Sequence, residues 1–248
     1  MQTRSAARKS RVRVPLFTQS GSSLVEVLAA MSAGLVVLGA ALQSFSYFHQ
    51  QFLKEGNTII QAQDVRVGLE LLAQELHLAS IGSLSVARPD AVEFTANISG
   101  LMTKVTAPGV MGETTLAVED GRGWPDNKLI GVCWNERCDS FTLARAGHRS
   151  LLAFVEPIAR PIPAGASAAV KNRVRYYSRL DESGILRFLR QVDGGASVLV
   201  GHVESIMFSY WDAQGRKTAH PGLVRRVIVE ITARHRAVAS KREITLRT

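Results

Sequence analysis

Residues 20–42 read SGSSLVEVLAAMSAGLVVLGAAL, and this stretch decides how the chain is organised. The apolar run 24–42 has about the length needed to cross a hydrocarbon core of roughly 30 Å. It carries one carboxylate, Glu26, close to its start. Because a carboxylate is costly inside a membrane segment, Glu26 is a candidate functional residue.

The formal net charge is +9, but it is unevenly distributed along the chain. Residues 1–21 contain no acidic residue and five basic ones: Arg4, Arg8, Lys9, Arg11 and Arg13. Subtracting this +5 from +9 leaves +4 for residues 22–248. Nucleic-acid-binding proteins usually carry their basic residues on one face of a folded domain. A basic tail before an apolar segment is instead typical of membrane targeting. We therefore expect no nucleic-acid partner.

Three interpretations compete for the N-terminal region, residues 1–48. A secretory signal has a shorter apolar region of about 7–15 residues and no carboxylate inside it. A plain signal anchor has the right length but leaves Glu26 without a role. Cleavage after Gly21 accounts for both features, because Ser22 becomes the N-terminus and Glu26 the fifth residue.

The string GSSLVE at 21–26 resembles the processing site of type IV prepilins and type II secretion pseudopilins. The resemblance implies that prepilin peptidase cuts between Gly21 and Ser22 and that Ser22 is then N-methylated. The family usually has phenylalanine after the cut, so Ser22 is a departure. Ser22 and Glu26 lie one helical turn apart, so the new ammonium can neutralise the carboxylate within one chain or between subunits. Glu26 is therefore expected to act in assembly and not in catalysis.

The helical pattern continues beyond the apolar segment. Apolar residues recur at steps of four and three and predict one buried stripe: Val65, Leu69, Leu72, Leu76 and Ala79. The polar residues between them predict a solvated or loosely packed face: Asp64, Arg66, Glu70, Gln74, Glu75 and His77. Gly82 is the expected C-cap, and Gly56-Asn57 is a possible interruption. A helix over residues 22–80 spans about 88 Å if unbroken.

After residue 82 the sequence changes to short β-like runs separated by turns. The expected strands are 91–96, 114–118, 129–134, 140–145, 151–156, 170–179, 185–192, 205–211 and 223–233. Strands 170–179 and 185–192 flank the turn sequence 181–184 and are expected to form a hairpin, as are 205–211 and 223–233 around a longer loop. In the last strand Val227, Val229 and Ile231 are expected to share one face. We therefore predict an α+β fold in which a long N-terminal helix, transmembrane in its first half, packs on an antiparallel β-sheet head like a lollipop. The corresponding regions are a cleaved basic leader (1–21), an apolar transmembrane and assembly helix (22–48), an amphipathic half-helix (49–82) and a β-rich head (83–248).

Cys133 and Cys138 are the two cysteines of the chain. If the head is exported, a disulfide between them is expected, since four intervening residues allow a hairpin or tight loop to bring them together. Reduced core thiols are the alternative. Zinc is not expected, because no two further ligands occur at matching spacing.

No catalytic constellation is recognisable, so we expect no enzyme activity, no cofactor and no metal. An oxygen-rich turn with Glu119, Asp120, Asp126 and Asn127 is either a solvated loop or a calcium site. A run of arginines at strand spacing is either a solvated sheet face or a contact for an acidic partner subunit: Arg173, Arg175, Arg179, Arg187 and Arg190.

Within the pilin-like family, the chain is most similar to minor pilins of the W type, which are related to the J-type minor pseudopilin of type II secretion. The similarity lies in SLVEVLAAMSAGLVVLGA near the start, FSYWDAQGR at 208–216 and REITLRT at 242–248. It implies a subunit that helps to assemble or initiate a type IV pilus. Prepilin peptidase, other minor pilins or pseudopilins and inner-membrane lipid are then its partners. The protein would lie in the inner membrane with its head in the periplasm, and after assembly in the pilus, at its tip.

Two alternatives to a pilus subunit stay open at this point. The first is a minor pseudopilin of type II secretion, which shares the same N-terminal physics, with a DNA-uptake pilus as a further setting. The second, from another class, is a membrane-anchored periplasmic enzyme or binding module. This class predicts no cleavage after Gly21 and tolerance of Glu26→Leu.

Overall fold

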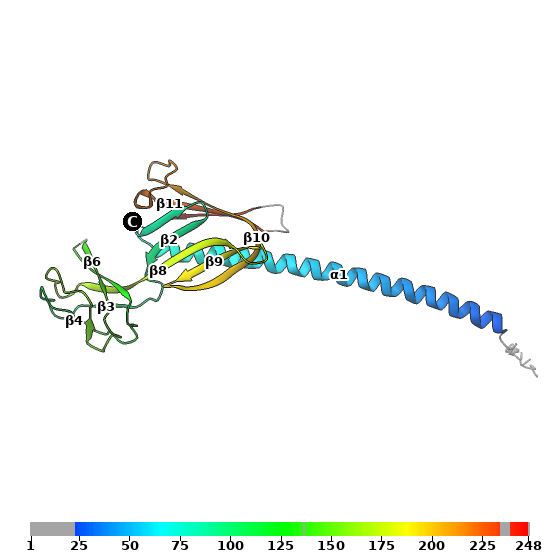
Figure 1. Cartoon of the computed structure of the whole chain (residues 1–248), viewed down its shortest axis with the longest axis horizontal. Helices are drawn as coiled ribbons and strands as arrows, with labels where there is room; N and C mark the ends of the chain where they lie inside the picture. Colours follow the sequence, from blue (N-terminus) through cyan, green and yellow to red (C-terminus); the bar gives the residue numbers. More distant parts are fainter. Residues whose placement is uncertain (1–22, 136, 234–238, 248) are drawn as a thin grey trace, which may run out of the picture. The chain divides into compact units, whose positions relative to one another are not determined.

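A computed structural model describes residues 23–135, 137–233 and 239–247. It contains one long helix and twelve strands within these residues (Figure 1). The elements are α1 (Leu24–His77), β1 (Leu84–Arg88), β2 (Ala91–Ala96), β3 (Met102–Lys104), β4 (Thr115–Ala117), β5 (Leu129–Trp134), β6 (Arg137–Thr142), β7 (Leu151–Ala153), β8 (Ser167–Leu180), β9 (Leu186–Val192), β10 (Gly195–Trp211), the 3₁₀ turn η1 (Pro221–Leu223), β11 (Arg226–Ala233) and β12 (Ser240–Thr245).

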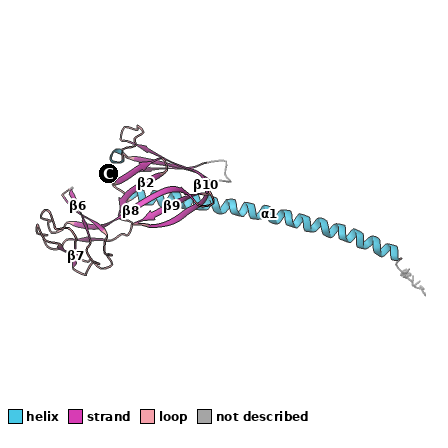
Figure 2. Cartoon of the chain, viewed as in Figure 1, coloured by secondary structure: helices cyan, strands magenta, loops and turns pink. Residues whose placement is uncertain are grey.

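The helix α1 runs without interruption through Gly56 and Asn57. The chain divides into two compact units between Lys54 and Glu55. The first unit therefore holds the apolar part of α1, and the second holds the rest of α1 with all of the strands (Figure 2).

The C-terminal end of α1 differs from the prediction. The helix ends at His77, and Leu78 and Ala79 donate backbone hydrogen bonds to carbonyls three residues earlier, which tightens the last turn. Gly82 does not cap it. Instead, Gly82 occupies the left-handed region (φ 81°) inside a turn closed by the bond from Ser83 N to Ser80 O, which leads into β1.

The main sheet has the strand order β1-β2-β8-β9-β10-β11-β12, and every neighbouring pair is antiparallel. It curves as a half-barrel around the last turns of α1 (Figure 1). The whole predicted helix stripe is buried in this core: Val65, Leu69, Leu72, Leu76 and Ala79. In β11 the side chains of Val227, Val229 and Ile231 are buried, and the residues between them are half-buried, so the predicted alternation is confirmed.

A bend in β10 accounts for part of the curvature. Its first half pairs with β9 and its second half with β11. The register shifts around Gly201-His202, and His202 adopts a φ of 55°. Such bulges bend a strand and increase its twist, which lets one strand serve both sides of the half-barrel.

A second core lies among residues 97–170. The first five residues of β8 pair with β3 and β5, β5 pairs with β6, and β4 and β7 form a separate two-stranded ladder. Buried apolar side chains fill this region, including Phe141 and Phe154, whose stacked rings lie 4.6 Å apart. The strand β8 therefore belongs to both cores.

The expected α+β class and antiparallel sheet are present. β2 and β5 match their predicted bounds, and the hairpins β8–β9 and β10–β11 form as expected. The prediction missed β1, β3, β12 and the first half of β10, and it placed β6 three residues late.

Candidate functional site

The first candidate site is the apolar part of α1. Leu24–Leu53 is long and apolar enough to cross a membrane by length and composition, and none of its side chains is buried within the protein. Glu26 is the only Asp, Glu, Lys or Arg in this segment. An exposed surface of this kind needs lipid or other helices to cover it.

Glu26 lies in the first turn of α1. Ser23 begins this turn: its hydroxyl oxygen accepts from Val25 N at 3.2 Å, and its carbonyl accepts from Glu26 N at 2.9 Å. Free N–H groups make a helix start favourable for negative charge. The predicted cleavage position between Gly21 and Ser22 lies outside the described residues.

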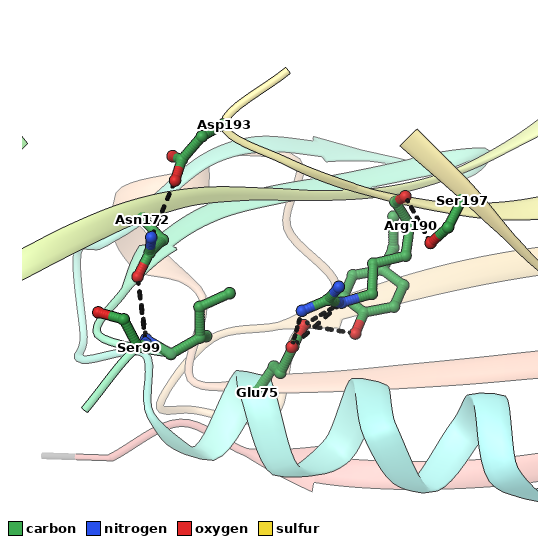
Figure 3. Close-up of polar contacts among 8 residues, drawn as sticks. Glu75, Ser99, Asn172, Arg190, Asp193 and Ser197 are labelled. Atoms are coloured by element: carbon green, nitrogen blue, oxygen red, sulfur yellow. Dashed lines mark hydrogen bonds and ion pairs between the residues drawn. The ribbon is translucent and has the colours of Figure 1, made fainter. Parts of the chain in front are cut away.

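The second candidate site is a buried ion pair between α1 and the sheet. The Glu75 carboxylate accepts from Tyr176 Oη at 2.6 Å and from Arg190 Nε at 3.0 and 3.1 Å, and Arg190 Nη2 also donates to it (Figure 3). The Glu75 side chain is 7% exposed and that of Arg190 is 23% exposed. Burial raises the pKa of Tyr176, and the neighbouring Glu75 raises it further, so the phenol stays protonated and donates.

This arrangement corrects two expectations. Glu75 is not on a solvated helix face, because α1 turns it toward the sheet, where a charged partner is available. Arg190 does not share a face with the other arginines. It is the cross-strand partner of Tyr176, whose side chain is buried, whereas Arg187 is opposite Arg179 on the outer face. Alternation along the predicted hairpin is the signal that separates Arg190 from the rest.

Asp193 forms a second polar node beside the sheet. It accepts from Lys128 Nζ at 2.7 Å and from Arg173 N at 2.8 Å. It also accepts from Nδ2 of the buried Asn172 at 2.8 Å, and Asn172 in turn accepts from Ser99 N at 3.3 Å (Figure 3). Burial acts to raise the pKa of Asp193, but the bonds from Lys128 and Asn172 outweigh it and hold the pKa below its usual value. Charged and amide groups thus tie the two cores together at this point.

The structure contains a disulfide between Cys133 and Cys138. The two residues are direct cross-strand partners in the hairpin β5–β6, and their Cα atoms are 4.1 Å apart. The sequence predicted a hairpin or a tight loop here, and the hairpin is what forms.

The oxygen-rich turn does not assemble into a metal centre in the part of the chain that the structure describes. Asp120 instead binds its neighbour Arg122 through both carboxylate oxygens, and this hydrogen bonding lowers the pKa of Asp120 to about 2. No group of three or more His, Cys, Asp or Glu side chains lies close enough to hold an ion among the described residues.

Comparison with known proteins gives no further assignment, since no protein-family model, curated protein or solved structure matches the chain.

Proposed function

We propose that this protein is a minor pilin-type subunit of a type IV pilus. It is held in the inner membrane by the apolar part of α1, processed by prepilin peptidase between Gly21 and Ser22, and then incorporated into a filament. Its role is structural, with the head in the periplasm making contacts to neighbouring subunits.

One observation carries the proposal. A single carboxylate, Glu26, stands in the first turn of an apolar helical segment of 30 residues whose surface is entirely uncovered. An isolated charge in such a segment is costly unless it finds a partner. A cut after Gly21 creates that partner, because it produces a new ammonium one helical turn from Glu26.

The same pairing explains how a subunit enters the filament. In the membrane, the ammonium of Ser22 neutralises Glu26 of its own chain. In a bundle of packed apolar helices, the low dielectric strengthens opposite-charge attraction, so Glu26 pairs with the ammonium of a neighbour. Adjacent subunits are then set in axial register by one ion pair.

The sheet domain supports an exported location. A disulfide such as Cys133–Cys138 persists mainly in oxidising compartments. The basic residues before the apolar segment favour retention of the N-terminus in the cytoplasm. Together these features predict a single crossing with the head in the periplasm.

The test is the N-terminal sequence and intact mass of the membrane-extracted protein, from cells with and without prepilin peptidase. A chain starting at N-methylated Ser22 only when the peptidase is present is expected. An unprocessed Met1 start, or a cut inside residues 29–41, would contradict the proposal and favour an anchored periplasmic enzyme or binding module.

The assembly role of Glu26 has its own comparison. Glu26→Gln is expected to be processed normally but to be lost from sheared filaments, because it cannot pair with the ammonium. Gln43→Ala is the matched control, since it changes a polar residue in the same exposed segment without removing charge. Equal incorporation of both variants would rule out the pairing.

A further inference from the structure

The outer face of β8 carries a row of positive charges. Lys171, Arg173, Arg175 and Arg179 alternate along the strand with the buried Val174 and Tyr176, so the four basic side chains share one face. Neighbours two residues apart on a strand lie about 7 Å from each other. Such a row repels itself unless each charge is compensated.

Three of these cations line a cleft of about 760 Å³ on this face: Lys171, Arg173 and Arg175. The other side of the cleft is formed by the turn that precedes β5, including Asp126 and Lys128. We call this cleft the basic groove.

Four cations and three carboxylates line the basic groove, so its positive charge is only partly compensated. Arg173 Nε pairs with Glu93 at 2.7 Å, and Lys128 pairs with Asp193 at 2.7 Å. Within the described part of the chain, neither Lys171 nor Arg175 forms an ion pair.

Arg175 is held in place but incompletely bonded. Its guanidinium carbon lies 4.9 Å from the centre of the Tyr177 ring, which orients the planar group. Its Nε is buried and has no hydrogen-bond acceptor among the described residues. Because Nε is closed to solvent, an incoming carboxylate has to bind the part of the guanidinium that lines the basic groove.

Lys171 is held at the other end of the groove. Its side chain crosses Gly131 of β5 to bring Nζ within 3.3 Å of Ser140 Oγ on β6. A Cβ atom at position 131 would lie 2.3 Å from Lys171 Cε, so only glycine permits this path. Burial lowers the pKa of Lys171. Gly131 is the cross-strand partner of Ala169, which precedes Lys171 in β8, whereas Arg175 follows it. The Lys171 side chain therefore extends away from Arg175.

We propose that the basic groove binds an acidic segment of a neighbouring subunit, with Arg175 donating hydrogen bonds to one carboxylate and Lys171 to a second. This inference rests on the proposed function for the presence of a neighbour. Four residues of extended chain place the Cα atoms of Lys171 and Arg175 about 13 Å apart. Because their side chains diverge, an extended peptide with carboxylates at matching spacing fits them better than one small anion. Arg175 supplies a planar fork for its carboxylate, and Lys171 acts as a point charge.

The test uses the full chain in detergent micelles and a fluorescent peptide that alternates glutamate and serine. Fluorescence anisotropy is expected to detect binding that weakens with salt. Replacing both cations (Lys171→Gln with Arg175→Gln) is expected to weaken binding about tenfold or more, since each loses a hydrogen bond to a charged group. Arg175→Lys keeps the charge but loses the fork, so it should bind with intermediate affinity.

Arg179→Gln is the matched control, because Arg179 lies on the same face of β8 outside the basic groove. It should bind the peptide as the wild type does. Urea unfolding of each variant verifies that the fold is retained. Equal loss in Arg179→Gln and the double variant would overturn the proposal, as would equally tight binding of a glutamine-serine peptide.

Two further outcomes separate this proposal from its alternatives. Inorganic phosphate is added as a competitor of the glutamate peptide. If phosphate at the same concentration as the peptide displaces it, the groove binds a small anion and the docking of a peptide is overturned. Cleavage after Gly21 is measured on the same preparations. Absent cleavage with specific peptide binding would refute the pilin assignment while leaving an acidic-peptide site, whereas normal cleavage without peptide binding would refute the groove alone.

Discussion

Removal of the Glu75 carboxylate tests whether the buried ion pair fixes α1 on the sheet. In Glu75→Ala, the hydroxyl of Tyr176 and the guanidinium of Arg190 lose their shared acceptor. Glu75 is 7% exposed and Arg190 is 23% exposed, so water replaces the lost contacts only in part. Breaking a buried pair from one side costs about 3–5 kcal/mol, and we expect this loss of unfolding free energy.

Urea unfolding of the full chain in detergent, followed by tryptophan fluorescence, measures this loss. With a urea slope of about 2 kcal/mol/M, the midpoint should fall by about 1.5–2.5 M. Glu70→Ala is the matched control, because Glu70 pairs with Arg242 at 3.0 Å while both side chains are about half exposed. Exposed pairs contribute about 0–1 kcal/mol, so this midpoint should barely move.

A double replacement distinguishes an uncompensated charge from a loss of packing. Glu75→Leu combined with Arg190→Met removes both charges and keeps apolar volume, so it should recover most of the lost stability. Glu75 does not fix α1 through a buried ion pair if Glu75→Ala is no less stable than Glu70→Ala, or if the double variant is no more stable than Glu75→Ala.

Three other predictions use the same unfolding assay. Leu72→Ala removes a fully buried side chain beneath the sheet and should lower the free energy of unfolding by about 2–5 kcal/mol. Gln74→Ala, on the exposed side of α1, is the control and should lower it little. Equal effects of the two variants would contradict the packing of α1 on the sheet. Replacing Cys133 and Cys138 by serine opens a short covalent loop and should cost about 2 kcal/mol on chain-entropy grounds, and reductant should lower the wild type to the level of the variant but leave the variant unchanged. The lowered pKa of Asp193 means that its ionised form stabilises the fold above its unfolded value of 3.8 and that this contribution is lost as the pH falls through the folded value. Asp193→Asn should therefore be less stable than the wild type at pH 7 and lose less stability between pH 4 and pH 2, and parallel pH profiles would refute this.

The sequence predicted the elements that local pattern determines. The helix stripe was predictable because its period of 3.6 residues spans several turns, and the β8–β9 hairpin because a turn sequence separates two apolar runs. β12 was missed because an edge strand rich in charge (SKREIT) has no apolar alternation. The β9–β10 hairpin had a signal that the prediction did not use: Asp193-Gly194, both at positive φ, typical of a two-residue turn.

The polar contacts show where sequence reasoning stops. The sequence alone makes Glu26 a candidate, because a carboxylate is conspicuous in an apolar segment. Glu75 was not, because its burial depends on Arg190, 115 residues further along the chain. A glutamate on an amphipathic helix is usually solvated. Only the tertiary fold supplies the charged partner that offsets the cost of burying the carboxylate.

The double membership of β8 also bears on how such a chain can vary during evolution. Ala96 and Asn172 are cross-strand neighbours, so the residues between them leave the main sheet and return to it at adjacent points. Such a segment can be lengthened, shortened or exchanged while the strand order around α1 stays the same. The sequence of the second core, and with it the binding surface that this core presents, can therefore change during evolution while the half-barrel around α1 stays the same.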